Sequence, residues 1–277
     1  MTKHANFTVR FWGVRGSVAC SGPDTRRYGG NTACVEVRCG NRLLAFDAGT
    51  GARPFGLSLP ARGPIHVDHF FSHAHWDHIT GFPFFSPAHR AECDITVRAG
   101  HLGPGGSIEA VLRQAMSKPL FPVPLEVFHA RFRFEDFLAG ATLELGDGIV
   151  VRSAALNHPD GATGYRVEFG GKSVCYVTDT EHVPGAPDHN VLGLISGADL
   201  VIYDSTYTDD EFPRYVGWGH STWQEGVRLC RAAGARRLAL FHHEPGRDDD
   251  ALDRIGRQAV AAFPGAFVAR EGETVAP

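Results

Sequence analysis

The sequence predicts an α+β fold in which two β-sheets pack face to face and helices lie on the outside. Short strand-like runs fill both halves of the chain, whereas helical spacing is confined to three segments. The 277 residues include 33 glycines and 17 prolines, a turn-rich composition that favours strands over a helical bundle. Because each sheet has an apolar face to bury, we expect the two strand-rich halves to pack on each other.

The predicted strands fall into two groups, one in each half of the chain. In the first half, two strands flank Gly40-Asn41, which is typical of a hairpin turn. In the second half, Gly146-Asp147-Gly148 and Gly170-Gly171 supply turns between strands. The predicted strands span residues 7–12, 34–38, 42–46, 65–72, 94–98, 141–145, 149–156, 164–169, 173–178, 199–203 and 237–241.

Helices are predicted over residues 107–117, 222–233 and 248–263, where apolar residues recur at helical spacing. The second is the best defined, because Ser221 can cap its N-terminus and Gly234 can end it. The third opens on acidic residues, which favour a helix N-terminus.

The chain is predicted to form one domain over residues 1–277, because no linker, charge run or low-complexity segment divides it. Residues 100–140 are the least regular part. Pro119, Pro122 and Pro124 fall there, so we expect a lid-like insertion at about 100–140.

Composition excludes several classes of protein. With 27 basic and 31 acidic residues the net charge is −4, which gives no support to binding of a polyanion. No uncharged stretch is long enough to span a bilayer, and residues 1–7 lack the apolar run of a secretory signal. Six cysteines without a Cys-x-x-Cys pair indicate free thiols in a reducing compartment. We therefore expect a cytoplasmic protein.

The strongest chemical signal is Ser72-His73-Ala74-His75-Trp76-Asp77-His78, which directly follows a predicted strand. Four ligand-type residues within six positions are enough for parts of two adjacent metal sites. Three more ligand-type residues also follow mostly apolar strands, where a rigid sheet can orient them. They are His158, Asp179 and His242.

Further motifs occur in order from about residue 7 to residue 245. They are Phe11-Trp-Gly-Val-Arg-Gly-Ser17, Arg27-Tyr-Gly-Gly-Asn-Thr32, Phe46-Asp-Ala-Gly-Thr-Gly51, Asn157-His158 with Gly164-Tyr165, Thr178-Asp179-Thr180, Asp204-Ser-Thr206, Gly219-His-Ser-Thr222 and Phe241-His242. Together with the cluster at 73–78 they resemble the metallo-β-lactamase-fold hydrolases. The likeness is greatest to the phosphodiesterase branch, which contains ribonuclease Z and the phosphoribosyl cyclic phosphodiesterases.

This resemblance implies an αββα sandwich of two mixed β-sheets with a dinuclear metal site at one edge. It assigns one divalent ion to His73, His75 and His158, and the other to Asp77, His78 and His242, with Asp179 bridging the two. Imidazoles and carboxylates without thiolate suit Zn²⁺, with Mn²⁺ or Fe as alternatives. Two cations about 3.5–4 Å apart can hold a hydroxide between them, and this hydroxide is the expected nucleophile.

The resemblance also implies a catalytic role for Asp77, His220 and Asp204. His220 precedes the predicted helix at 222–233, and its counterpart in the phosphodiesterase branch faces the scissile phosphate and pairs with an acid. Asp204 stands where that acid is expected, and the pair would donate a proton to the leaving oxygen. For Asp47, support of the histidine cluster and simple turn formation fit the sequence equally well.

The insertion bears on the substrate. Residues 101–138 contain four basic and four acidic side chains, so the segment is neutral and unlike a basic arm for tRNA. The leading hypothesis is therefore a phosphodiesterase for a small, cyclic nucleotide or ribose phosphate. A tRNA 3′-processing endonuclease and a lactonase or other ester hydrolase are the alternatives. We expect no membrane partner and no extended nucleic acid, and a homodimer is compatible with the sequence.

Overall fold

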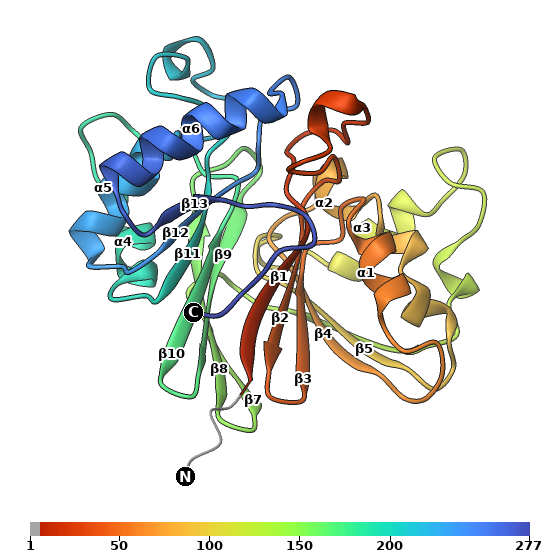
Figure 1. Cartoon of the computed structure of the whole chain (residues 1–277). Coiled ribbons are helices and arrows are strands. Elements are labelled where there is room, and N and C mark those ends of the chain that lie inside the picture. The colour runs from red at the N-terminus through yellow and green to blue at the C-terminus, as the bar shows by residue number, and fades with distance from the viewer. Residues whose placement is uncertain (1–5) are drawn as a thin grey trace.

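A computed structural model describes residues 6–277. In that part of the chain two seven-stranded β-sheets pack face to face, and helices cover their outer sides (Figure 1). The predicted αββα sandwich of two mixed sheets is confirmed.

The first sheet contains strands from the N-terminal half and one strand from the C-terminus. Its strands are β1 (Phe7–Gly13), β2 (Cys34–Cys39), β3 (Arg42–Phe46), β4 (His66–Phe71), β5 (Asp94–Ala99), β6 (Arg131–Asp136) and β14 (Thr274–Val275). Their order is β14-β1-β2-β3-β4-β5-β6. The pairs from β14 to β3 are antiparallel, and those from β3 to β6 are parallel.

The second sheet repeats this plan with the remaining strands. They are β7 (Thr142–Gly146), β8 (Ile149–Leu156), β9 (Ala162–Phe169), β10 (Lys172–Val177), β11 (Leu200–Asp204), β12 (Leu238–Phe241) and β13 (Ala266–Val268). Their order is β13-β12-β11-β10-β9-β8-β7. Because β10 to β13 run parallel, the chain leaves β10, β11 and β12 at the same edge of the sheet.

Helices on both outer sides bury the remaining apolar faces. They are α1 (Ala52–Ser58), α2 (Trp76–Ile79), α3 (Ile108–Ala115), α4 (His189–Ile195), α5 (Trp223–Ala233) and α6 (Asp249–Ala262). Figure 1 shows α4, α5 and α6 on the side of the second sheet, and α1 and α3 on the opposite side. Apolar residues of each set form a core with the sheet that they cover.

The third core lies between the sheets and is rich in aromatic rings. Phe46 of β3 stacks on Phe70 of β4 with 5.3 Å between ring centroids, and it lies 5.5 Å from Tyr165 of β9 in the other sheet. All three side chains are buried, and full burial of a large apolar side chain contributes about 1.5–3 kcal/mol. This contact therefore fixes the spacing of the two sheets below the edge where the polar residues gather.

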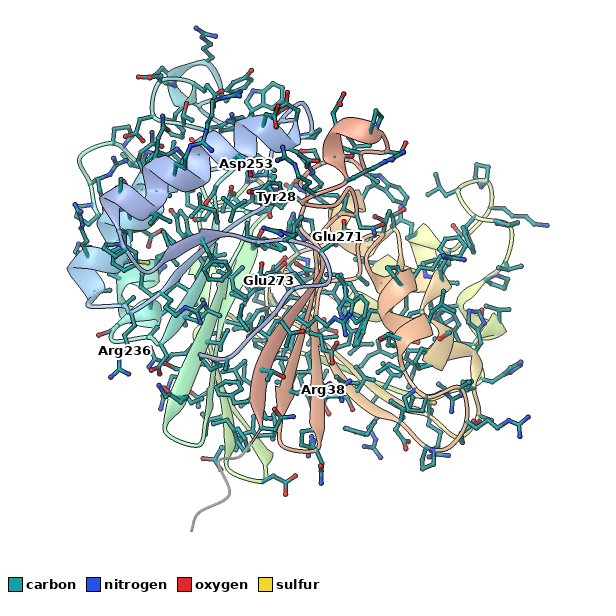
Figure 2. The ribbon with its side chains drawn as sticks, viewed as in Figure 1. Tyr28, Arg38, Arg236, Asp253, Glu271 and Glu273 are labelled. Atoms are coloured by element: carbon teal, nitrogen blue, oxygen red, sulfur yellow. The ribbon has the colours of Figure 1, made fainter. Side chains whose placement is uncertain are left out.

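The N-terminal loop is bonded both to α6 and to the C-terminal segment (Figure 2). The Tyr28 hydroxyl donates to Asp253 at 2.7 Å, and the Glu271 amide donates to the Tyr28 carbonyl at 2.9 Å. The Glu271 carboxylate accepts from the Asn31 side-chain amide at 3.0 Å. These bonds hold the glycine-rich loop at 27–31 in place.

Two expectations from the sequence need correction, and several short elements were not predicted. Residues 131–136, inside the expected lid-like insertion, form β6, whose alternating Arg-Phe-Arg-Phe pattern is that of a sheet strand. The N-cap of α5 is Thr222 and not Ser221, since the Thr222 hydroxyl accepts the Glu225 amide at 3.0 Å. The short elements α1, α2, α4, β13 and β14 were not predicted, because too few residues carry their periodicity.

Two expectations from composition can be compared with the structure. All six cysteines lie in the described range and are free. Within residues 6–277, no helix combines the length and the apolar character needed to cross a bilayer.

A buried ion-pair cluster joins the parallel strands of the first sheet. Asp68 of β4 is buried, and its two oxygens accept from Arg42 and Arg98 at 2.6 Å each. Burial acts against ionisation of Asp68, but the two guanidinium groups keep its pKa below the ordinary value. The carboxylate is thus charged and fully paired.

Asp68→Ala should lower the free energy of unfolding by about 3–5 kcal/mol, because it leaves two guanidinium groups without their buried partner. Asp94→Ala, which removes an exposed ion pair with Arg131 on the neighbouring strand, is the matched control and should cost much less. Urea titrations of both variants measure this difference. The stabilisation from Asp68 should be complete above its ordinary pKa of 3.8 and fade as the pH falls through its lower folded-state pKa. Equal losses in the two variants would contradict this account.

Candidate metal centre

Seven ligand-type side chains converge at the edge where the strands of both sheets end. His73 and His75 follow β4, and Asp77 and His78 lie in α2, which begins at Trp76. The other three each follow a strand of the second sheet, and six of the seven side chains are buried, with His75 the exception. They are His158 after β8, Asp179 after β10 and His242 after β12.

The first group consists of His73, His75 and His158. His158 Nε2 lies 3.1 Å from His75 Nδ1, and His73 Nε2 is buried without a hydrogen-bond partner among the described residues. Burial lowers the pKa of His73 and of His158, which favours the neutral imidazole that metals bind.

The second group consists of Asp77, His78, His242 and Asp179. Asp77 Oδ2 lies 3.2 Å from both His78 Nε2 and His242 Nε2, and the two nitrogens are 3.3 Å apart. Burial acts against ionisation of Asp77, but the neighbouring His78 and His242 side chains hold its pKa well below the ordinary range. Asp77 is therefore an ionised carboxylate.

Asp179 lies between the two groups and faces both. Its Oδ2 is 3.6 Å from His73 Nε2 and 4.0 Å from His158 Nε2, whereas its Oδ1 is 3.3 Å from His78 Nε2 and 3.2 Å from His242 Nε2. Burial is outweighed by these neighbours, so the pKa of Asp179 lies well below its ordinary value. One carboxylate is thus shared by four imidazoles from three segments of the chain.

This donor set fits divalent metal ions. Two nitrogens that face each other at 3.1–3.3 Å can share at most one proton, whereas two ligands about 2.0–2.1 Å from one tetrahedral ion lie about 3.3 Å apart. The unpartnered Nε2 of His73 indicates the same. Divalent metals therefore suit these residues, with three imidazoles in the first group and two imidazoles and a carboxylate in the second.

Asp47 supports the cluster from behind. Its Oδ2 accepts from His78 Nδ1 at 2.8 Å and from the Tyr176 hydroxyl at 2.8 Å. Both of its oxygens also accept from Ser72, through the amide and the hydroxyl, at 2.7 Å each. Of the two interpretations of Asp47 that fit the sequence, the structure thus favours orientation of a histidine over simple turn formation.

Further partners hold the other imidazoles and Asp77. His158 Nδ1 donates to the Gly219 carbonyl at 2.8 Å, and His242 Nδ1 lies 3.2 Å from the Thr206 hydroxyl. Asp77 Oδ2 accepts the Ser17 amide at 2.7 Å. The loop that delivers Ser17 passes directly over His242, where Gly16 leaves no room for a Cβ atom. Nothing in the composition of this loop predicted that contact.

His220 and Asp204 form a separate pair beside Asp179. His220 Nδ1 lies 3.0 Å from Asp204 Oδ2 and 3.8 Å from Asp179 Oδ2. Burial acts against protonation, but the charges of Asp204 and Asp179 raise the pKa of His220 to about 9. The short side chain of Asp204 reaches His220 without difficulty, because β11 ends at Asp204 itself.

Asp204, His220, His242 and Asp179 are also close enough to hold an ion between them. However, the Asp204 oxygens already accept from the Thr180 amide and from the amide and hydroxyl of Thr206. A carboxylate engaged in this way orients His220 and has little capacity left for a metal.

Three further histidines do not join the cluster. His182 stacks on Phe212 and bonds to Ser221, and His243 donates to the Ala269 carbonyl. His101, which sequence reasoning missed, follows β5; burial lowers its pKa to about 4, and neither ring nitrogen has a partner within residues 6–277. A single histidine in an irregular segment gives no pattern from which its place could be predicted.

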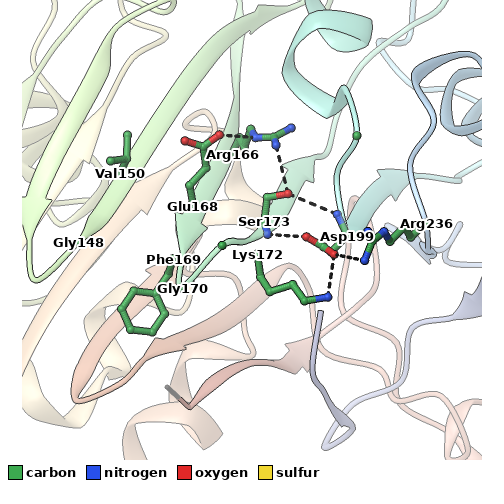
Figure 3. A pocket seen from close by; sticks show the side chains of 12 residues that line it. Gly148, Val150, Arg166, Glu168, Phe169, Gly170, Lys172, Ser173, Asp199 and Arg236 are labelled. Atoms are coloured by element: carbon green, nitrogen blue, oxygen red, sulfur yellow. Dashed lines mark hydrogen bonds and ion pairs between the residues drawn. The ribbon is translucent and has the colours of Figure 1, made fainter. Parts of the chain in front are cut away.

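A cavity of 610 Å³ lies away from these residues (Figure 3). It is lined by residues where β10, β11 and β12 begin, whereas the cluster follows the ends of these strands. Its cations are already paired: Lys172 and Arg236 bond to Asp199, and Arg166 bonds to Glu168. The cavity therefore offers no free charge for a phosphate.

The fold and the convergent His/Asp cluster define a metal-dependent hydrolase. A family model described as the beta-lactamase superfamily domain matches residues 42–243. The chain belongs to this superfamily and, within it, to the phosphodiesterase branch of the metallo-β-lactamase-fold hydrolases.

One relative supports this placement, and two solved structures share the fold. A ribonuclease Z of Myxococcus xanthus is 43% identical over 88% of this chain and 92% of its own length. The metallo-β-lactamase-fold protein YhfI from Bacillus subtilis superposes with a TM-score of 0.73 at 19% identity, covering 98% of this chain and 99% of that one. A diphosphatase of the PhnP family superposes with a TM-score of 0.71 at 18% identity, covering 97% and 96%.

The purified protein should carry about two transition-metal ions per chain, because the donors form two groups that share Asp179. Elemental analysis after reconstitution and dialysis measures this ratio. One ion per chain, or none, would contradict a dinuclear centre.

Asp179→Ala should lose more metal than His158→Ala, because Asp179 faces both groups and His158 faces one. The expected result is nearly complete loss in Asp179→Ala and retention of about one ion in His158→Ala. Both variants remove a buried polar side chain, so each serves as the stability control for the other. Equal metal retention would remove the basis for a bridging role.

Proposed function

We propose that the protein hydrolyses a small, cyclic nucleotide or ribose phosphodiester at a dinuclear metal centre. The observation that carries this proposal is the pairing of His220 with Asp204 beside the Asp179 carboxylate. A phosphodiester with an alkoxide leaving group needs a proton donor at that place, whereas simple metal storage does not.

The proposed metal ligands are those already described in two groups. His73, His75 and His158 would hold one ion, Asp77, His78 and His242 the other, and Asp179 would contact both. When bound, two divalent ions lower the pKa of water and neutralise the charge that develops on the phosphate oxygens. Asp47, Thr206 and the Gly219 carbonyl hold the imidazoles in orientation, so little rearrangement is needed during the reaction.

His220 is the proposed general acid. Because Asp204 accepts the proton on Nδ1, the second ring nitrogen, Nε2, is left to deliver a proton to the departing oxygen. The attacking water gives up one proton to solvent, and its oxygen forms the new bond to phosphorus as the ester P–O bond breaks. The proton from His220 converts the leaving alkoxide into an alcohol. Asp204 stabilises the imidazolium form that precedes this transfer.

The preference for a small substrate rests on residues 101–138. The segment is neutral, and two of its four cations are paired in the structure: Arg113 bonds to Glu109 and Glu126, and Arg131 bonds to Asp94. Moreover, β6 and α3 fold against β5 and do not extend as an arm. A basic arm for a long polyanion is therefore not supported by these residues.

A tRNA 3′-processing endonuclease is the second candidate, because the Myxococcus xanthus relative is named ribonuclease Z and matches most of both chains. A turnover screen of the metal-loaded protein with cyclic nucleotides, bis-p-nitrophenyl phosphate, a lactone and a precursor tRNA separates the candidates. Turnover of the precursor tRNA alone would favour the endonuclease, and turnover of the lactone alone would favour an ester hydrolase.

His220→Ala should slow hydrolysis of a 2′,3′-cyclic nucleotide by about 10²–10⁴-fold and hydrolysis of bis-p-nitrophenyl phosphate much less. The difference arises because a ribose alkoxide must be protonated as it leaves, whereas nitrophenolate is stable as an anion. Steady-state kinetics on both substrates, with metal content measured in parallel, test this prediction.

Asp204→Asn is the matched positioning variant and should show the same pattern more weakly, since the imidazole remains but loses its charged partner. Equal slowing on both substrates at unchanged metal content would mean that His220 holds phosphate oxygens and does not supply a proton. If neither substrate is slowed, the proposal loses its main support.

A further inference from the structure

A row of aromatic rings leads from His220 toward solvent. Tyr207 meets His220 edge to face at 6.1 Å between ring centroids, and Tyr215 stacks in parallel on Tyr207 at 4.4 Å. Trp218 then packs edge to face against Tyr215 at 5.5 Å. These three rings, Tyr207, Tyr215 and Trp218, come from the segment between β11 and α5 and are called the aromatic row below.

The outermost ring is exposed, yet its backbone is fixed. Trp218 is 63% exposed, but Glu181 accepts the amides of Gly217 and Gly219 on either side of it, at 2.7 and 2.9 Å. The Trp218 amide donates to the Tyr215 carbonyl at 3.1 Å. Since the Gly219 carbonyl also accepts from His158, the loop is bonded directly to the candidate metal centre. An exposed indole on such a rigid loop is preorganised for contact with a ligand.

Other exposed apolar side chains adjoin the centre in sequence. Trp76 directly precedes Asp77, and Val18 directly follows Ser17, whose amide bonds to Asp77. Two exposed apolar side chains thus stand next to residues of the candidate centre in the chain.

The charge of the loop disfavours recognition of a long polyanion. Between Ser205 and Gly219 the sequence has one cation, Arg214, against three carboxylates. Two of these carboxylates are already paired, Asp209 with Arg228 and Glu211 with Arg247. The chemistry that the aromatic row offers is therefore stacking on a planar ring and not capture of phosphates.

We propose that Trp218, supported by Tyr215, stacks on the base of a nucleoside phosphodiester whose leaving alcohol faces His220. This inference rests on the proposed function, because His220 marks the position of the leaving alcohol only if it is the proton donor. A group attached to the departing oxygen lies on the side of His220, and the aromatic row begins there. The substrate class is then a nucleotide, in preference to a ribose phosphate without a base.

The test compares Trp218→Ala with Val216→Ala, because both residues are 63% exposed and lie on the same loop. The substrates are 2′,3′-cyclic AMP and glycerol 1,2-cyclic phosphate, which share the cyclic diester and the alkoxide leaving group. The second substrate lacks the ribose and the base. Trp218→Ala should raise KM for 2′,3′-cyclic AMP roughly tenfold, as expected for loss of one base–aromatic stack, and leave kcat nearly unchanged. Val216→Ala should change neither substrate, and Trp218→Phe should restore most of the affinity.

Calorimetric binding of 3′-AMP to the metal-loaded protein gives a readout that needs no turnover. It should weaken about tenfold in Trp218→Ala and stay unchanged in Val216→Ala. Equal affinity in the three proteins, or an equal rise in KM for both substrates, would overturn the stacking site. If the wild-type protein hydrolyses neither substrate but the difference in 3′-AMP binding persists, the proposed reaction is wrong and the stacking site stands.

Discussion

The shared carboxylate of Asp179 is the contact on which the rest of the site depends. Its two oxygens face different pairs of imidazoles, so the side chains that follow β4, β8 and β12 must all reach one point. Burying so many polar groups is costly unless each is paired or bound to a cation. The sandwich brings these side chains together because the strands end at one edge of the paired sheets. Metal ions bound there would offset the cost of burying the carboxylates.

Backbone strain at the same edge agrees with this interpretation. Asp47, Asp179 and His242 adopt positive φ angles of 57°, 55° and 60°, which are unfavourable for residues other than glycine. Each of the three leaves a strand and immediately turns its side chain into the cluster. The packed strands beneath them, including the contacts of Phe46 between the sheets, hold these turns in place.

Much of this arrangement could be predicted from the sequence, because its signals are local. Strand β8 was predicted with the bounds Ile149–Leu156, and the ligand-type residues after strands were visible as single polar positions behind apolar runs. Strand β6 was missed because nearby prolines suggested a loop, and the cap of α5 was shifted by one residue because Ser221 and Thr222 are chemically alike. The aromatic row and the bonds of Glu181 depend on tertiary contacts, which no local pattern encodes.

We propose that the seven ligand-type side chains hold two ions that share Asp179, and that His220 and Asp204 bind neither ion. The most direct measurement is the anomalous scattering of crystals of the metal-loaded protein, recorded on both sides of the metal absorption edge. Two peaks are expected, one about 2.0–2.2 Å from His73, His75 and His158 and one at that distance from Asp77, His78 and His242, with Asp179 contacting both. A single peak, or a peak bound by His220 and Asp204, would contradict this proposal.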